Sequence, residues 1–191
     1  MSYKTYTTEA LVCGSAAHNT SDKNYLLFSR EGGMIWATAR SVREERSKQR
    51  QALQDFSWVR VSLVKGKSGW RIGSAEALGN SFLSAQTRSE RGIVKQVILQ
   101  LRRYVHGEVS LPRVYDDVAE LLLCNTADER DLSAQLFSVR LLSELGYVAP
   151  DHAWMSVVEA QSLRDAVALY TEHMQPYISR AIHEGAQASH L

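Results

Sequence analysis

Residues 58–63 read Trp58-Val59-Arg60-Val61-Ser62-Leu63, and this stretch decides the fold of the first part of the chain. Its alternation predicts a β-strand that buries one face, with either Trp58 or Val59 on the core side according to register. The residues that follow, Lys65-Gly66-Lys67-Ser68-Gly69, predict a hairpin turn. Trp70–Ala77 then supplies the returning strand.

Three further strands are predicted upstream of this hairpin. They cover Glu9–Cys13, Lys23–Ser29 and Met34–Ala39, and the pair Gly32-Gly33 marks the turn between the last two. Residues 41–54, between the third and fourth strands, are compatible with a helix. Five short strands with an insert at that point are the layout of an OB-fold barrel.

From about Ser84 the hydrophobic period changes to 3.6, which predicts helices. The first helix carries its apolar stripe from Ile93 to Val105 and stops at Gly107. Pro112 opens the second helix, because proline suits a first helical turn. A third helix is predicted over 129–145.

The C-terminal part predicts one long helical stretch over 153–184, bent at Pro176. We therefore predict an α+β chain with two domains. Residues 1–80 form a five-stranded OB-fold barrel that binds nucleic acid, and residues 81–191 form a helical bundle.

Composition and charge narrow the class of protein. The chain has 191 residues, of which 45% are hydrophobic and 23% charged, as in ordinary globular proteins. Apolar runs such as Leu121–Cys124 are too short to span a bilayer, and the N-terminus lacks a secretion signal, so a cytoplasmic protein without membrane contact is expected.

The two parts of the chain differ in charge. Residues 1–80 carry 12 Lys and Arg against 7 Asp and Glu, whereas residues 81–191 carry 10 against 14. The two parts are therefore expected to have different partners.

Patterns that would indicate catalysis or a metal are missing from the sequence. Cys13 and Cys124 lie far apart in apolar surroundings, which predicts small buried side chains rather than a thiolate zinc site. The six histidines show no metal-binding spacing. Asp116, Asp117 and Glu120 are placed to favour a helix N-terminus. The sequence predicts no enzyme, no cofactor and no metal.

A basic run points to a binding surface. Residues 40–50, called here the basic connection, read Arg-Ser-Val-Arg-Glu-Glu-Arg-Ser-Lys-Gln-Arg. Alone, such a run is typical of a solvated face. Between two strands of a barrel that commonly binds single-stranded nucleic acid, it favours phosphate contact. The predicted contact residues, together with those of the hairpin, are Arg40, Arg43, Arg46, Lys48, Arg50, Lys65, Lys67, Trp70 and Arg71.

Aromatic side chains could add base stacking to these phosphate contacts. The candidates are Tyr25, Trp36, Trp58 and Trp70, of which at least two are expected in the core. We expect Trp36 and Trp58 to be core residues, and leave Trp70 open between the two roles.

The order of several motifs resembles the RecO family of bacterial recombination-mediator proteins. These motifs are Glu9-Ala10-Leu11-Val12, Ser21-Asp22-Lys23, Phe28-Ser29-Arg30-Glu31-Gly32-Gly33, Ala37-Thr38-Ala39-Arg40, Ala52-Leu53-Gln54-Asp55-Phe56, and Leu136 to Pro150 with its Gly146-Tyr147-Val148-Ala149-Pro150 ending. The chain departs from the family pattern at Thr38, where the family has lysine followed by glycine. It also has Asp-His-Ala-Trp at 151–154, where many members place a four-cysteine zinc module. We therefore expect a zinc-free member.

The resemblance implies a non-enzymatic role in recombinational DNA repair. Family members bind single- and double-stranded DNA, anneal complementary strands, contact RecR and single-strand-binding protein, and help to load RecA. Phosphate neutralisation on the barrel would let two repelling strands approach each other. The helical part is expected to hold the acidic C-terminal tail of single-strand-binding protein. The candidate contacts are Arg102, Arg103 and Arg140, with ordinary surface ion pairs as the alternative for each.

Two other functions stay open at this point. The chain could be an adaptor whose contacts are mainly with proteins of the repair machinery and whose DNA binding is weak or lost. It could also be an enzyme, such as a nuclease that acts on the bound strand, although the basic part of the chain has no carboxylate cluster.

Overall fold

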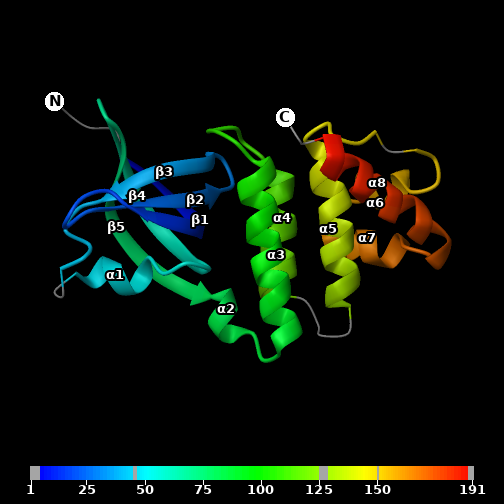
Figure 1. Cartoon of the computed structure of the whole chain (residues 1–191), viewed down its shortest axis with the longest axis horizontal. Coiled ribbons are helices and arrows are strands. Elements are labelled where there is room, and N and C mark those ends of the chain that lie inside the picture. Colours follow the sequence, from blue (N-terminus) through cyan, green and yellow to red (C-terminus); the bar gives the residue numbers. More distant parts are fainter. Residues whose placement is uncertain (1–4, 45–46, 125–128, 150, 189–191) are drawn as a thin grey trace. The chain divides into compact units, whose positions relative to one another are not determined.

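The computed structural model describes residues 5–44, 47–124, 129–149 and 151–188, and it contains a β-barrel and a set of helices (Figure 1). The strands and the short helix among them are β1 (Thr5–Ala17), β2 (Lys23–Ser29), β3 (Gly33–Ala39), α1 (Lys48–Ala52), β4 (Ser57–Gly66) and β5 (Gly69–Asn80). All five predicted strands are confirmed. The first and last are longer than the sequence pattern indicated.

The strands close into a ring in the order β1-β2-β3-β5-β4, which confirms the predicted five-stranded barrel. Neighbouring strands are antiparallel except for β3 and β5, which pair in parallel between Ala37–Ala39 and Trp70–Ile72. Strand β1 pairs with β4 along its first part and with β2 along its second. An irregularity in register between Val12 and Gly14 accompanies this change of partner.

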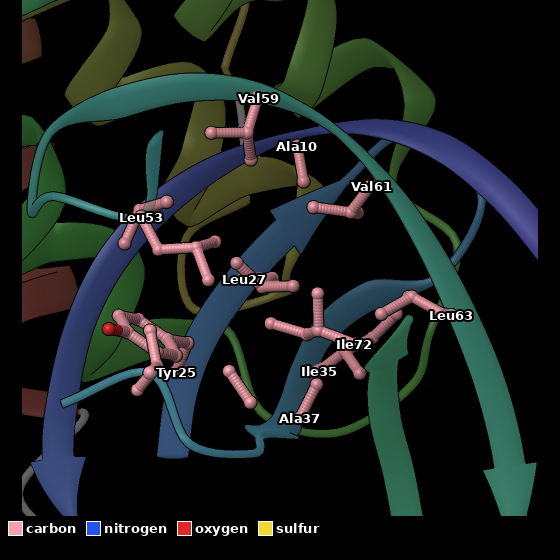
Figure 2. Close-up of a cluster of buried hydrophobic side chains, with 13 residues drawn as sticks. Ala10, Tyr25, Leu27, Ile35, Ala37, Leu53, Val59, Val61, Leu63 and Ile72 are labelled. Atoms are coloured by element: carbon pink, nitrogen blue, oxygen red, sulfur yellow. The ribbon is translucent and has the colours of Figure 1, made fainter. Parts of the chain in front are cut away.

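One cluster of apolar side chains fills the barrel (Figure 2). The register of β4 is now settled, because Val59, Val61 and Leu63 all belong to this cluster and are fully buried. Trp58 is buried on the opposite face of the strand, where its Nε1 donates a hydrogen bond to Ser81 Oγ at 2.9 Å. The expectation that Trp58 is a core residue is therefore confirmed.

The β2–β3 turn is tied to a segment distant in sequence. Gly33 adopts a positive φ of 61°, and the N–H of Met34 donates to the carbonyl of Gly107 at 3.0 Å. A Cβ on Gly33 would come within 2.1 Å of the Val109 carbonyl oxygen, so the approach of the two backbones requires glycine. Residues His106–Leu111 accordingly belong to the same compact unit as the barrel.

The rest of the chain is helical. The elements are α2 (Ser81–Ser84), α3 (Arg88–Tyr104), α4 (Pro112–Ala119), the π-helical turn η1 (Glu120–Cys124), α5 (Arg130–Glu144), α6 (Met155–Glu159), α7 (Leu163–Leu169), the 3₁₀ turn η2 (Glu172–Met174) and α8 (Gln175–Ala188). Two compact units result. The barrel unit comprises Met1–Val94 and His106–Leu111, and the helical unit comprises Lys95–Val105 and Pro112–Leu191.

The prediction of one long helix over 153–184 is wrong, because this stretch contains α6, α7, η2 and the first part of α8. The chain leaves helical geometry at Ala160, and Ser162 then caps α7 by accepting a hydrogen bond from the N–H of Asp165 at 3.1 Å. Pro176 is the second residue of α8, where its fixed φ is tolerated, and therefore does not bend a continuous helix.

A buried ion pair links three elements of the helical unit. Arg140 on α5 donates to both carboxylate oxygens of Asp117 on α4, at 2.7 and 3.1 Å. Its remaining nitrogen donates to the carbonyls of Val157, Val158 and Ala160 at the end of α6. Burial raises the pKa of Asp117, although its bonds to Arg140 act in the opposite direction. Arg140 is only 4% exposed, so it serves the packing of its own unit.

Removing the Asp117 carboxylate is therefore expected to destabilise the chain strongly. Asp117→Ala leaves the Arg140 guanidinium buried without its counter-charge, and we expect a loss of about 3–5 kcal/mol in the free energy of unfolding. Urea unfolding followed by circular dichroism measures this loss. The control is Asp116→Ala, because Asp116 is adjacent and exposed, and its replacement should cost less than about 1 kcal/mol. Equal losses in the two variants would contradict the role given to the pair.

Candidate nucleic-acid interface

Hydrogen bonds anchor the start of the basic connection to the β1–β2 turn. The backbone N–H of Ser41 donates to Asp22 Oδ1 at 2.8 Å. The N–H of Arg43 donates to the carbonyl of Ser21 at 3.1 Å, and its guanidinium donates to the carbonyl of Asn19 at 3.0 Å. This part of the connection is thus held on the barrel by backbone contacts, which fixes the position from which Arg43 acts.

The Asp22 carboxylate is the centre of this anchor. Ser41 has a positive φ of 51°, a left-handed conformation that the hydrogen bond to Asp22 supports. Asn19 Nδ2 donates to the other carboxylate oxygen at 2.9 Å. The hydrogen bond from the Ser41 N–H, followed by that from Asn19, lowers the pKa of Asp22 below its ordinary value.

The lowered pKa gives a pH dependence that can be measured. We expect Asp22 to titrate below the ordinary aspartate value of about 3.9 in a carboxyl ¹³C NMR titration. Because the pKa is depressed by folding, the stability that Asp22 contributes is complete above the ordinary value and is lost as the pH falls through the lower one. Asn19→Ala removes one donor and should move the titration towards the ordinary value. An unchanged midpoint in this variant, or a wild-type midpoint at or above the ordinary value, would contradict the anchor.

An open pocket of about 810 Å³ is lined by residues of β1, β2, α1 and the two segments that flank α1. We call it the barrel-end pocket, because its apolar floor consists of barrel-core residues. The floor is formed by Tyr25, Val42 and Leu53, the cations are Lys23, Arg43 and Arg50, and the other lining residues are Ala17, Ser47, Gln51, Gln54 and Asp55. Three cations thus face one carboxylate.

The pocket brings together two of the residues predicted from the sequence, Arg43 and Arg50, and adds Lys23, which sequence reasoning missed. Strand pairing explains the addition, because Lys23 is paired with Ala39 on β3 and so lies next to the start of the basic connection. Its ammonium lies over the ring of Tyr25, 5.4 Å from the centroid. A sheet register assigned from the sequence would have found it.

The other residues of the basic connection are placed differently. Arg40 is exposed but does not line the pocket. Lys48 begins α1, and its side chain lies outside the described part of the structure. Arg46 also lies outside the described residues.

The cations of the β4–β5 hairpin differ in whether a carboxylate pairs with them. Lys65 forms an ion pair with Glu108 at 3.1 Å, and its ammonium lies 4.9 Å from the centroid of the Trp70 ring. Trp70 Nε1 donates to the same carboxylate at 2.8 Å. The hydrogen bonds from Lys65 and Trp70 lower the pKa of Glu108. We call these three residues the hairpin cluster. By contrast, Lys67 is exposed in the turn, and Arg71 is half-buried on β5.

The aromatic residues proposed for base stacking differ in burial, and the sequence predicted their burial only in part. Trp36 is 51% exposed on β3, so its assignment to the core is wrong. Its outward position follows from strand alternation, because Ile35 and Ala37 on either side belong to the barrel core. Tyr25 is a core residue, and Trp70, which had been left open, is partly buried against the core cluster.

The predicted partner residues of the helical unit also have different surroundings. Arg102 and Arg103 are exposed in the last turn of α3. Arg103 donates to the carbonyl of Ala186 at 3.2 Å and lies over the ring of Tyr104. Arg140 is buried with Asp117, and its guanidinium is therefore withdrawn from the surface.

The described residues show neither a metal-binding cluster nor a membrane-spanning helix. Within the described ranges, no group of three or more His, Cys, Asp or Glu side chains is arranged to hold a metal ion. Cys13 is buried, as predicted, while the side chain of Cys124 lies outside the described part. Among the described helices, none has both the length and the apolar character needed to cross a membrane.

Several known proteins are similar in sequence to this chain. Residues 1–80 match the family model described as "Recombination protein O N terminal". A protein of Nocardioides sp. named "DNA repair protein RecO" is 30% identical over 166 residues, which are 86% of this chain and 60% of that protein. Its namesake in Syntrophobacter fumaroxidans is 27% identical over 152 residues, or 76% of this chain and 58% of that protein.

A shorter match is closer in sequence. "DNA repair protein RecO" of Desulfitobacterium hafniense is 44% identical over 63 residues, which are 33% of this chain and 23% of that protein. The chain thus spans less than two thirds of the length of each of these relatives.

Proposed function

We propose that this chain, which belongs to the RecO family of DNA repair proteins, is a non-enzymatic DNA-binding mediator of recombination. It binds single- and double-stranded DNA mainly through phosphates and anneals complementary strands. With RecR, it helps to load RecA on DNA coated by single-strand-binding protein. The observation that carries this proposal is the convergence of Lys23, Arg43 and Arg50 on one pocket of the barrel.

The availability of these cations supports phosphate binding. Within the described residues, Lys23, Arg43 and Arg50 form no ion pair with a carboxylate, so their charges can meet those of a strand. Two other cations of the barrel, Arg60 and Lys65, are already paired. Arg60 lies 2.9 Å from Glu9 and 3.5 Å from Glu76, and Lys65 is bound by Glu108. Phosphate contacts neutralise strand charge and carry little sequence information, as an annealing protein requires.

Salt dependence tests the pocket as the DNA contact. For single strands, each phosphate contact contributes about 0.7 to the slope of log K against log salt concentration. The double variant Arg43→Ala/Arg50→Ala should weaken binding to a fluorescent oligonucleotide at low salt and reduce that slope by about 1.4. Fluorescence anisotropy across a salt series measures both.

The matched control is Arg60→Ala, since it removes a cation that Glu9 and Glu76 already pair. It should leave the slope near that of wild type. If wild type itself does not bind at low salt, the DNA-binding proposal fails and a protein adaptor becomes the better interpretation.

Glu108→Gln tests whether the hairpin takes part in the same contact. The change removes the charge that pairs Lys65 but keeps an oxygen that can accept from Trp70. If Lys65 then meets a phosphate, DNA affinity should rise and the salt slope should steepen by about 0.7. Glu76→Gln is the control, because it also removes one negative charge, from an ion pair with Arg60 elsewhere on the barrel. Equal increases in the two variants would mean that overall charge, rather than the hairpin, is responsible.

The helical unit is proposed to contact the acidic tail of single-strand-binding protein through Arg102 and Arg103. Both residues are exposed in one turn at the end of α3, where positive charge suits the helix dipole. The Arg103 guanidinium also donates to the carbonyl of Ala186. Arg140 is not included because its guanidinium is buried in an ion pair. A strand-annealing assay with and without single-strand-binding protein tests DNA binding and this partner contact together.

A further inference from the structure

Phosphate binding explains the cations of the barrel-end pocket but not its floor. Val42 and Leu53 are 1% and 2% exposed, and both belong to the barrel core. A phosphate is a strong hydrogen-bond acceptor and gains nothing from an apolar floor. Pockets with an apolar floor, a few convergent polar groups and volumes of about 300–1,000 Å³ instead take organic ring systems. At about 810 Å³, this pocket falls within that range.

The hydroxyl of Tyr25 is available to a ligand in the pocket. Tyr25 as a whole is only 2% exposed, and within the part of the chain that the structure describes its hydroxyl has no hydrogen-bond partner in the protein. The oxygen itself is not sealed from solvent, so it can donate to a group that enters the pocket. Figure 2 shows this hydroxyl pointing away from Leu27 and Ile35 in the barrel core. Burial, reinforced by the charge of Asp55, raises the pKa of Tyr25, so the hydroxyl keeps its proton and can donate.

The neighbouring groups complete a set that matches the edge of a nucleobase. Gln54 supplies an amide with both a donor and an acceptor, and the Asp55 carboxylate is an acceptor that Ser15 Oγ contacts at 3.2 Å. Base edges present donors and acceptors side by side. Because the Lys23 ammonium lies over the ring of Tyr25, the hydroxyl of that residue, rather than its ring face, is available to a ligand.

We propose that the barrel-end pocket takes one unstacked base of a bound single strand. The base lies against Val42 and Leu53, with its edge towards the Tyr25 hydroxyl and the side chains of Gln54 and Asp55. The flanking phosphates meet Arg43 and Arg50. This inference rests on the proposed function and adds to it a direct contact with bases.

A preference for single strands follows from this arrangement. In a duplex the bases are paired and stacked, and extruding one of them costs free energy. Duplex DNA therefore reaches the cations of the rim but not the floor of the pocket. The pocket thus gives the barrel a way to distinguish an unpaired strand from a duplex.

The test compares two oligonucleotides with the same number of phosphates. One carries a base on every sugar, and the other consists of abasic units; both are about 16 nucleotides long, the upper end of OB-fold site sizes. The intact chain should bind the base-containing strand more tightly than the abasic one by at least roughly twofold to tenfold, the range expected for one net hydrogen bond to a base. Fluorescence anisotropy at low salt measures this ratio.

Two variants locate the effect, and a third controls it. Tyr25→Phe removes the hydroxyl but keeps the ring in the core, and Gln54→Ala removes the amide. Both should reduce the ratio and leave binding of the abasic strand and of duplex DNA unchanged, which also shows that the variants are folded. Tyr6→Phe is the matched control, because the Tyr6 hydroxyl donates to Glu31 and lies outside the pocket lining. It should leave the ratio at the wild-type value.

The outcomes separate this inference from the proposed function. Equal wild-type affinity for both strands, together with weaker binding in Arg43→Ala/Arg50→Ala, overturns the base pocket and keeps phosphate binding. A ratio that neither Tyr25→Phe nor Gln54→Ala changes places the base contact elsewhere and likewise overturns the inference. Absence of binding to either strand at low salt overturns the proposed function and the base pocket with it.

Discussion

The parallel pairing of β3 with β5 is the constraint on which the candidate site depends. Because β5 lies between β3 and β4 in the ring, the chain that leaves β3 cannot turn directly into β4. The segment that joins these two strands contains the basic connection. Val42 and Leu53, near its two ends, are buried in the barrel core. The cations between them are therefore brought to a surface whose floor is the core itself.

The barrel could be predicted from the sequence because each strand has its own local sequence pattern. Residues 58–63 alternate, and glycines mark the turn before β3 and the turn after β4. The register of β4 could not be predicted, because Trp58 and Val59 are both apolar and both are buried, on opposite faces of the strand. The same uncertainty in register hid the outward position of Trp36 and the arrival of Lys23 at the pocket.

The remaining discrepancies arise from contacts between residues distant in sequence or from capping. Arg140 reads as a surface arginine until Asp117 and three carbonyls are brought to it by the folding of α4, α5 and α6. No sequence pattern connects Glu108 with Lys65 or Trp70, so their contact could not be predicted. Periodicity suggested a single helix after residue 153, because apolar spacing can continue across a break that a capping residue such as Ser162 creates. Arg43 and Arg50, which line the barrel-end pocket, were predicted as contact residues because they lie in one dense basic run.

The position of Gly33 has a consequence for how the barrel can be studied in isolation. The family model ends at residue 80, but the compact unit that contains the barrel also includes His106–Leu111. A fragment cut at residue 80 loses the Gly107 carbonyl that accepts from Met34, and it also loses the carboxylate of Glu108. Such a fragment carries a barrel with an unpaired Lys65 and an uncovered β2–β3 turn. Its affinity for polyanions would exceed that of the barrel in the intact chain, and its stability would be lower.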